Sequence, residues 1–113
     1  MILDQETYSV ELDEATNVVR LKGIMRQNGL AEYAPVTELL TEAATRGDTL
    51  TLDLTELDFL NSSGIAMLSK FVIAMRGKPV GLAVRGSNTI PWQGKSLPNL
   101  KKLMPPLDLQ FDG

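Results

Sequence analysis

A strand that leads through a serine turn into a helix is the feature that most constrains how this chain folds. Every second residue from 50 to 54 is leucine, an alternation typical of a strand with one buried face. The turn Asn61-Ser62-Ser63-Gly64 follows, and apolar residues then recur at helical spacing until Gly77. We therefore expect a strand that points toward the turn and a helix over residues 62–76.

The first turn of this helix favours a negative group. The first N–H groups of a helix have no partner inside the helix, and the helix dipole is positive at this end. Ser62 and Ser63 lie there, so a phosphate added to a serine would be tolerated. The same residues also fit a capped helix with no further role, because Asn, Ser and Gly are common where a strand turns into a helix.

Patterns elsewhere in the chain predict an α/β fold. A length of 113 residues with 43% hydrophobic residues fits one domain with its own core. The other expected strands cover residues 7–12 and 18–24, which form a hairpin, 80–84, parallel to the leucine strand, and 107–111, at an edge. The other expected helices cover residues 32–46 and about 97–104, the latter with Ser96 as a candidate cap. We expect a single domain over residues 1–113, with a mixed sheet of about four to five strands and helices packed mainly on one face.

The order of these residues resembles the STAS family, which includes bacterial anti-sigma factor antagonists and the cytoplasmic tails of sulfate transporters. The residues that carry the resemblance are a strand with Asp53, a short spacer, and Asn61-Ser62-Ser63-Gly64 before an apolar helix. The resemblance is best over residues 48–77. It implies a STAS-like fold with Ser62 as the phosphate acceptor and Ser63 as the runner-up. Family antagonists usually carry Asp directly before the acceptor, whereas this chain has Asn61.

The resemblance also implies a non-catalytic regulatory module that switches between protein partners and takes part in signal transduction and transcription regulation. The partner would be an anti-sigma factor or a serine kinase of the family type, with a phosphatase as a further candidate. At 100° per residue, Leu68 and Val72 fall on the core side of the helix and Ile73 on the outer side, unless the last helix covers Ile73. The expected partner-binding residues are Asn61, Ser62, Ser63, Ala66, Met67, Ser69, Lys70 and Ile73.

Phosphorylation of Ser62 would act through local electrostatics. A phosphate adds about −1.5 to −2 charges at neutral pH. The helix dipole favours an anion here by about 0.3–1 kcal/mol, so the domain is expected to stay folded. A partner pressed against the same spot would have to remove water from that charge, and binding would fail. The alternative is a STAS-like scaffold or small-ligand-binding module without phosphorylation.

The residues that enzymes most often use are missing. The chain has no histidine and no cysteine, so Ser62 has no evident base and we expect no enzyme activity. We also expect no cofactor and no metal. Asp53, Glu56 and Asp58 could together bind magnesium, but a solvated loop is the favoured interpretation.

Charge and hydropathy limit the other partners. A net charge of −3 argues against a nucleic-acid surface. No apolar run approaches 20 residues and no signal peptide is evident, so we expect no membrane association. Together with the absence of cysteine, this predicts a cytoplasmic protein. Trp92 lies in a polar segment, residues 87–96, and is either a lid on the sheet edge or a second contact site.

Overall fold

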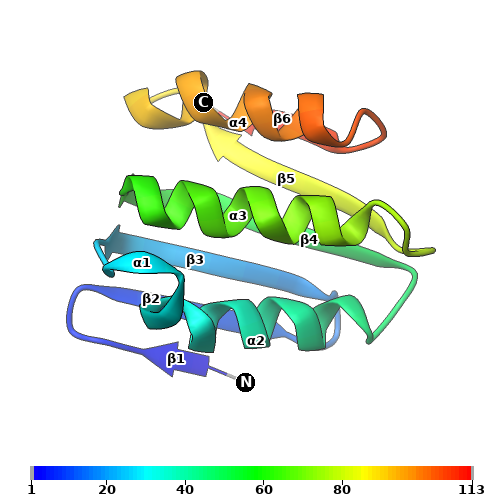
Figure 1. Ribbon diagram of the computed structural model, residues 1–113, viewed down its shortest axis with the longest axis horizontal. Coiled ribbons are helices and arrows are strands. Elements are labelled where there is room, and N and C mark those ends of the chain that lie inside the picture. The colour runs from blue at the N-terminus through cyan, green and yellow to red at the C-terminus, as the bar shows by residue number, and fades with distance from the viewer. Residues whose placement is uncertain (1, 113) are drawn as a thin grey trace.

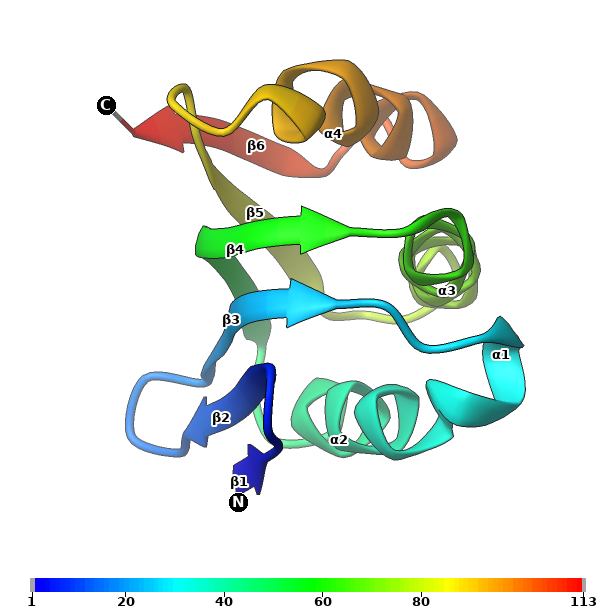
Figure 2. The same cartoon turned by 90° about the vertical axis from the view of Figure 1, so that its left-hand side faces the viewer.

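Within the part of the chain that the structure describes, six strands form one sheet, and four helices pack on the same face of it (Figures 1 and 2). The structure is a computed structural model and describes residues 2–112. The strands are β1 (Ile2–Asp4), β2 (Tyr8–Asp13), β3 (Val18–Met25), β4 (Thr49–Leu60), β5 (Gly81–Ser87) and β6 (Asp108–Asp112). The helices are α1 (Gly29–Glu32), α2 (Ala34–Ala44), α3 (Ser62–Met75) and α4 (Pro91–Leu103). The predicted α/β fold is confirmed, with six strands rather than four to five.

The strands follow one another across the sheet in sequence order. β1, β2 and β3 are antiparallel neighbours, and β3, β4, β5 and β6 are parallel neighbours, so the sheet is mixed as predicted. The expected hairpin of β2 and β3 and the parallel pairing of β4 with β5 are both confirmed. β1 was not predicted, because three residues are too few to show an alternating pattern.

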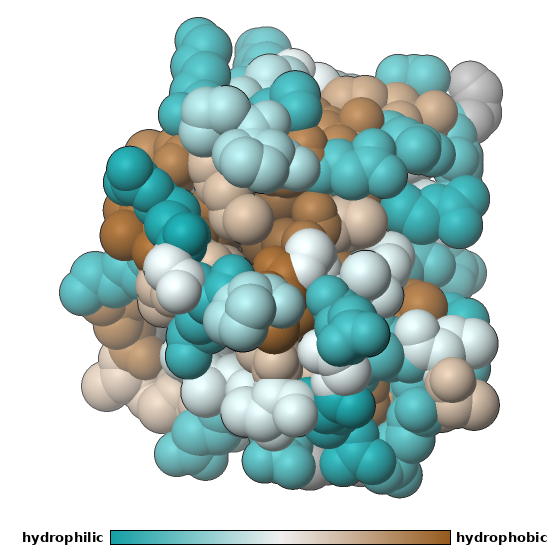
Figure 3. Space-filling view, turned by 90° about the vertical axis from the view of Figure 1, so that its right-hand side faces the viewer, coloured by the Kyte–Doolittle hydropathy of each residue, from teal (hydrophilic) through white to brown (hydrophobic). Residues whose placement is uncertain are grey.

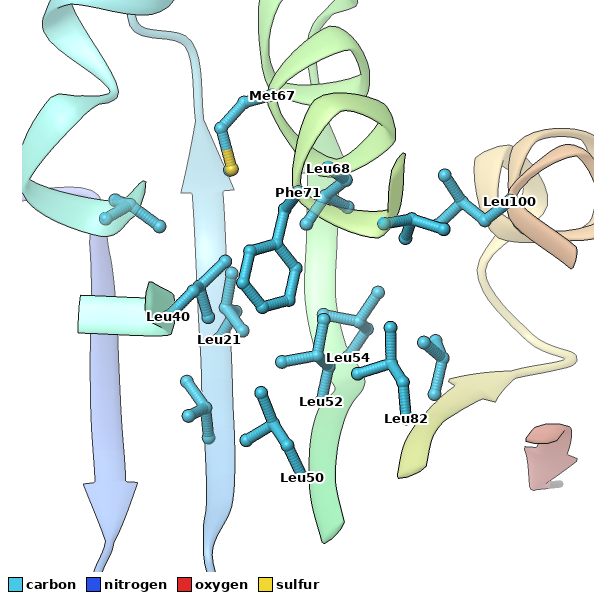
Figure 4. Close-up of a cluster of buried hydrophobic side chains, with 14 of the residues drawn as sticks. Leu21, Leu40, Leu50, Leu52, Leu54, Met67, Leu68, Phe71, Leu82 and Leu100 are labelled. Atoms are coloured by element: carbon cyan, nitrogen blue, oxygen red, sulfur yellow. The ribbon is translucent and has the colours of Figure 1, made fainter. Parts of the chain in front are cut away.

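The hydrophobic core lies between the helix-covered face of the sheet and the helices. Figure 4 shows leucines of β3, β4 and β5 pointing toward side chains of α2, α3 and α4. The labelled residues are Leu21, Leu50, Leu52, Leu54 and Leu82 from the strands, and Leu40, Met67, Leu68, Phe71 and Leu100 from the helices. All of them are buried. Within residues 2–112 the other face of the sheet carries no helix (Figure 2), and polar side chains such as Arg20, Asp53, Arg85 and Gln110 lie on it.

β4 is longer than its leucine alternation predicts. Beyond Leu54 the buried positions are Leu57 and Leu60, three residues apart, because the pairing with β3 shifts register twice. Such bulges interrupt the alternation that marks a strand in a sequence. The expected solvated loop at residues 53–58 is therefore wrong, since these residues belong to the strand.

Two of the three carboxylates expected in that loop have basic partners across the strand. Asp53 lies 3.9 Å from Arg20, and Glu56 lies 3.3 Å from Lys22. Both basic residues come from β3 and face the side of the sheet without helices. These carboxylates are thus part of the charged surface of the sheet.

α4 begins earlier than expected. Pro91 stands at its first turn, so Ser96 lies inside the helix and is not its cap. Proline is well suited to the first turn, because it has no N–H group to leave unpaired there. The polar segment of residues 87–96 is therefore helical from Pro91 onward. None of the helices within residues 2–112 combines the length and the apolar character needed to cross a bilayer.

Candidate functional site

Asn61 holds the start of α3 through both ends of its side-chain amide. Its backbone is extended, and its Oδ1 accepts a hydrogen bond from the Gly64 N–H at 2.9 Å, which caps the helix. The same Oδ1 accepts a bond from the Tyr33 hydroxyl at 2.8 Å. At the other end of the amide, Nδ2 donates to the Gln27 carbonyl at 2.8 Å. Asn61 thereby joins α3 to the loop before α1 and to the residue that links α1 with α2.

Tyr33 is fully buried beneath this turn. Burial raises the pKa of its hydroxyl to about 12, because the charged form would lose its water. Tyr33 therefore stays protonated and continues to donate to Asn61 over the physiological pH range.

Gly64 allows the turn to pack closely. A Cβ atom at this position would lie 2.1 Å from Leu60 Cδ1 and 2.7 Å from the Tyr33 hydroxyl oxygen. Both distances are far below van der Waals contact, so a larger residue would push the start of α3 away from the core. The glycine after the two serines is thus required by packing.

The two serines differ in what they contact. The Ser63 hydroxyl accepts a hydrogen bond from the Gly29 N–H at 3.1 Å and is half-buried. Ser62 is exposed, and its hydroxyl has no hydrogen-bond partner within the described residues. Figure 2 looks onto this end of the molecule, where the start of α3 lies beside α1 at the carboxyl ends of β3 and β4. Ser62 is therefore the serine that an enzyme or a partner could reach.

The rest of the predicted partner surface is partly exposed. Ala66, Lys70 and Ile73 are exposed, and Ile73 keeps 46% of its surface, so the last helix does not cover it. Ser69 is half-buried and its hydroxyl donates to the Ile65 carbonyl at 2.9 Å. Met67 differs from expectation, because it is only 2% exposed. It lines the space between α3 and α2.

Two residues that contribute to this site were not predicted from the sequence. Tyr33 and Gln27 reach Asn61 only through the folded chain, since 28 and 34 residues separate them from it. A signal for Tyr33 was available, because it precedes the buried Val36 and Leu40 of α2 at helical spacing. Nothing in the sequence marked the Gln27 carbonyl.

A cation also lies close to this end of the sheet. The Arg26 guanidinium stacks over the Phe59 ring at 5.0 Å from its centroid. Phe59 is 38% exposed although it belongs to β4.

Within residues 2–112, no three carboxylate, imidazole or thiol side chains converge as metal ligands do.

Trp92 has a structural partner. Its indole N–H donates to the Leu57 carbonyl of β4 at 3.0 Å, and its ring packs against the core. This contact favours the interpretation of Trp92 as a lid on the sheet edge over its interpretation as a second contact site. The adjacent Gln93 is fully buried and was not singled out in the sequence.

Comparison with known proteins relates the chain to one family. The family model described as "Mlab, STAS domain" matches residues 8–104, which include every element from β2 to α4. A search of curated proteins found no match.

Solved structures share the fold over nearly the whole chain. The crystal structure of apo-SiaC from Pseudomonas aeruginosa aligns with a TM-score of 0.72 at 14% identity, covering 97% of this chain and 93% of that chain. A chain in the crystal structure of the diguanylate cyclase SiaD in complex with its activator SiaC, from the same organism, aligns with a TM-score of 0.68 at 18% identity, covering 96% and 95%. At these identities the likeness is one of fold.

Proposed function

This chain belongs to the STAS domain family, and on that premise we propose that it is a non-catalytic regulatory module that binds a partner protein. The proposed contact surface is the start and the exposed side of α3, with Ser62, Ala66, Lys70 and Ile73 outermost. Phosphorylation of Ser62 switches the binding off.

The observation that supports this proposal most strongly is the accessibility of Ser62: of the polar side chains in the turn, only its hydroxyl is exposed and without a hydrogen-bond partner among the described residues. Asn61 and Ser63 hold the turn together through their side chains, whereas the Ser62 hydroxyl faces solvent at the first position of a 14-residue helix. A phosphate on Ser62 would keep its water and lie at the positive end of the helix dipole. The chain can accept this charge without unfolding.

Asn61 changes the electrostatics of the switch. The family pattern has a carboxylate directly before the acceptor serine, and this chain has a neutral amide. A phosphate on Ser62 therefore has one negative charge fewer beside it, so the electrostatic repulsion in the modified state is smaller. A kinase that recognises the family pattern through its Asp would not act on this chain.

The partner is a protein whose activity the module controls. An anti-sigma factor or a serine kinase of the family type is the first candidate, with a phosphatase that removes the phosphate. A second precedent on this fold is SiaC, which is described as the activator of a diguanylate cyclase. A bound enzyme switched by this module is therefore a second candidate.

Phosphate mapping tests the site. Incubation of the protein with ATP and a lysate of its host, followed by mass mapping of peptides, should place a phosphate on Ser62 and leave Ser63 unmodified. Ser62→Ala should abolish the modification. Phosphate on Ser63 alone, or none at all while a STAS protein with the Asp-Ser-Ser-Gly turn is modified in the same lysate, would contradict the switch.

A charge variant tests its effect on binding and folding. Ser62→Asp should change the free energy of unfolding by less than about 1 kcal/mol, because the helix dipole favours the charge. It should also lose the proteins that the wild-type chain retains in pull-down experiments. Asn99→Asp adds the same charge at an exposed position of α4 and should retain them. Loss of folding in Ser62→Asp would show that the hydroxyl is not free.

A further inference from the structure

An open groove separates α2 from α3. The two helices lie side by side and run in the same direction (Figure 1), and the space between them measures about 510 Å³. Leu30 lies at one end, and Met67, Phe71 and Ala74 give it an apolar floor and α3 side, whereas the α2 side carries Ala34 together with threonines and glutamates. In the end view of Figure 3, hydrophobic side chains reach the surface on the side of the molecule that carries the helices.

The two rims of the groove carry opposite charges. Glu38 and Glu42 line it on α2, and Lys70 lines it on α3. Glu42 is engaged, since it lies 3.7 Å from Arg46. Within residues 2–112, neither Glu38 nor Lys70 has an ion-pair partner. The rims therefore present one unpaired negative and one unpaired positive charge on either side of an apolar floor.

The shape and the charges fit a helix better than a lipid. α2 has 11 residues, so the groove extends about 16 Å at 1.5 Å per residue, or about three helical turns. A third helix laid between two helices packs its side-chain ridges into their grooves. An anionic lipid surface would be repelled by the acidic rim and by the net charge of −3.

We propose that the α2–α3 groove binds an amphipathic helix of the partner protein, with basic residues along the flank beside Glu38 and an acidic residue along the flank beside Lys70. Leucine-type side chains one turn apart would fill the space over Met67 and Phe71. The opposite charges of the rims fix which way round the helix lies. This inference deepens the proposed function and rests on it in one respect, namely that the partner is a protein. It does not depend on phosphorylation of Ser62.

Two synthetic peptides test the assignment. Each is an 18-residue amphipathic helix with the same composition and the same leucine stripe; one carries Lys and Glu flanks in the proposed arrangement and the other has them exchanged. Fluorescence anisotropy should show the matched peptide binding at least 10-fold more tightly. The double variant Glu38→Lys with Lys70→Glu should reverse this preference.

NMR of protein with labelled methionine methyl groups tests where the peptide lies. The methyl resonance of Met67 should shift on binding, while those of Met25 in β3 and Met104 after α4 should not.

A matched pair of arginine variants locates the peptide. Ala74→Arg, in the groove wall, should weaken binding at least 10-fold. Asn99→Arg, at an exposed position of α4 outside the proposed contact surface, should leave it unchanged, and the assay uses unmodified protein, so its outcome does not depend on phosphorylation of Ser62. A failure of this proposal is thereby separate from a failure of the phosphorylation switch.

Three results would overturn the proposal. The first is equal affinity for the two peptides, or no saturable binding of either. The second is a shift of Met67 that depends on protein concentration without peptide, which would assign the groove to a second copy of the chain. The third is co-sedimentation with vesicles of anionic phospholipid that Ala74→Arg abolishes.

Discussion

At the scale of single residues, Asn61 shows why an amide stands where the family pattern has a carboxylate. Its Oδ1 accepts two hydrogen bonds, from Gly64 and Tyr33, which an aspartate could accept equally well. Its Nδ2 donates to the Gln27 carbonyl at 2.8 Å, which an ionised aspartate could not do. In this chain the residue before Ser62 is therefore one that suits the loop packed against it.

The variant Asn61→Asp should lose this bond and set a carboxylate oxygen against a carbonyl oxygen. We expect the free energy of unfolding to fall by about 1–3 kcal/mol in urea denaturation at pH 7. The deficit should shrink below about pH 4, where a protonated carboxyl group can donate to Gln27. Asn99→Asp, the same change at an exposed site, should stay within about 0.5 kcal/mol of wild type. Equal stability of the two variants would show that the Gln27 contact contributes little.

At the scale of elements, Gln93 joins three parts of the fold. The pairing of β4 with β5 ends at Asp53 and Arg85, and beyond this point the two strands separate. Gln93 of α4 fills the gap: its Nε2 donates to the Leu54 and Leu57 carbonyls at 2.6 and 3.1 Å. Its Oε1 accepts from the Ser87 N–H at 2.7 Å. A single buried side chain thus replaces the missing backbone ladder.

Gln93→Leu tests this role, because it keeps the size of the side chain and removes its polar groups. The buried Leu54 carbonyl and Ser87 N–H would lose a partner, and we expect a loss of about 2–4 kcal/mol in the free energy of unfolding. Gln110→Leu makes the same change at an exposed position of β6 and should have little effect. Thermal and urea unfolding of the two variants would measure the difference.

Elements with a regular pattern could be predicted from the sequence, and those shaped by tertiary contacts could not. The leucine alternation at residues 50–54 and the helical spacing after Gly64 gave β4 and α3 their correct types. The second half of β4 was missed because its bulges break the alternation. The first half of α4 was missed because Gln93 reads as a polar loop residue, although the fold buries it completely. The candidate site follows the same division: the exposure of Ser62 was expected, while the partners of Asn61 come from distant positions.

At the scale of the whole molecule, the domain depends on a core on one side of its sheet. The open face carries ion pairs such as Arg20 with Asp53 and Arg85 with Asp112, at 3.9 and 3.1 Å. Ion pairs at a surface contribute little to stability, typically about 0–1 kcal/mol each. Most of the stability must therefore come from the packing of the helices on the covered face. Disturbing a residue where several helices meet should weaken the entire domain.

Tyr33 is such a residue, and its ionisation should make the domain sensitive to alkaline pH. Its pKa is raised from 10.0 to about 12 by burial, so the folded chain holds a proton that the unfolded chain releases above about pH 10. The free energy of unfolding should thus be unaffected by this group below pH 10 and should fall between about pH 10 and 12, by up to about 1.4 kcal/mol per pH unit. Tyr33→Phe should lose about 1 kcal/mol at pH 7 with the hydrogen bond to Asn61, and should flatten the alkaline decline. Urea denaturation of the wild type and of Tyr33→Phe at a series of pH values measures both. A decline of the same slope in Tyr33→Phe would place its cause elsewhere in the chain.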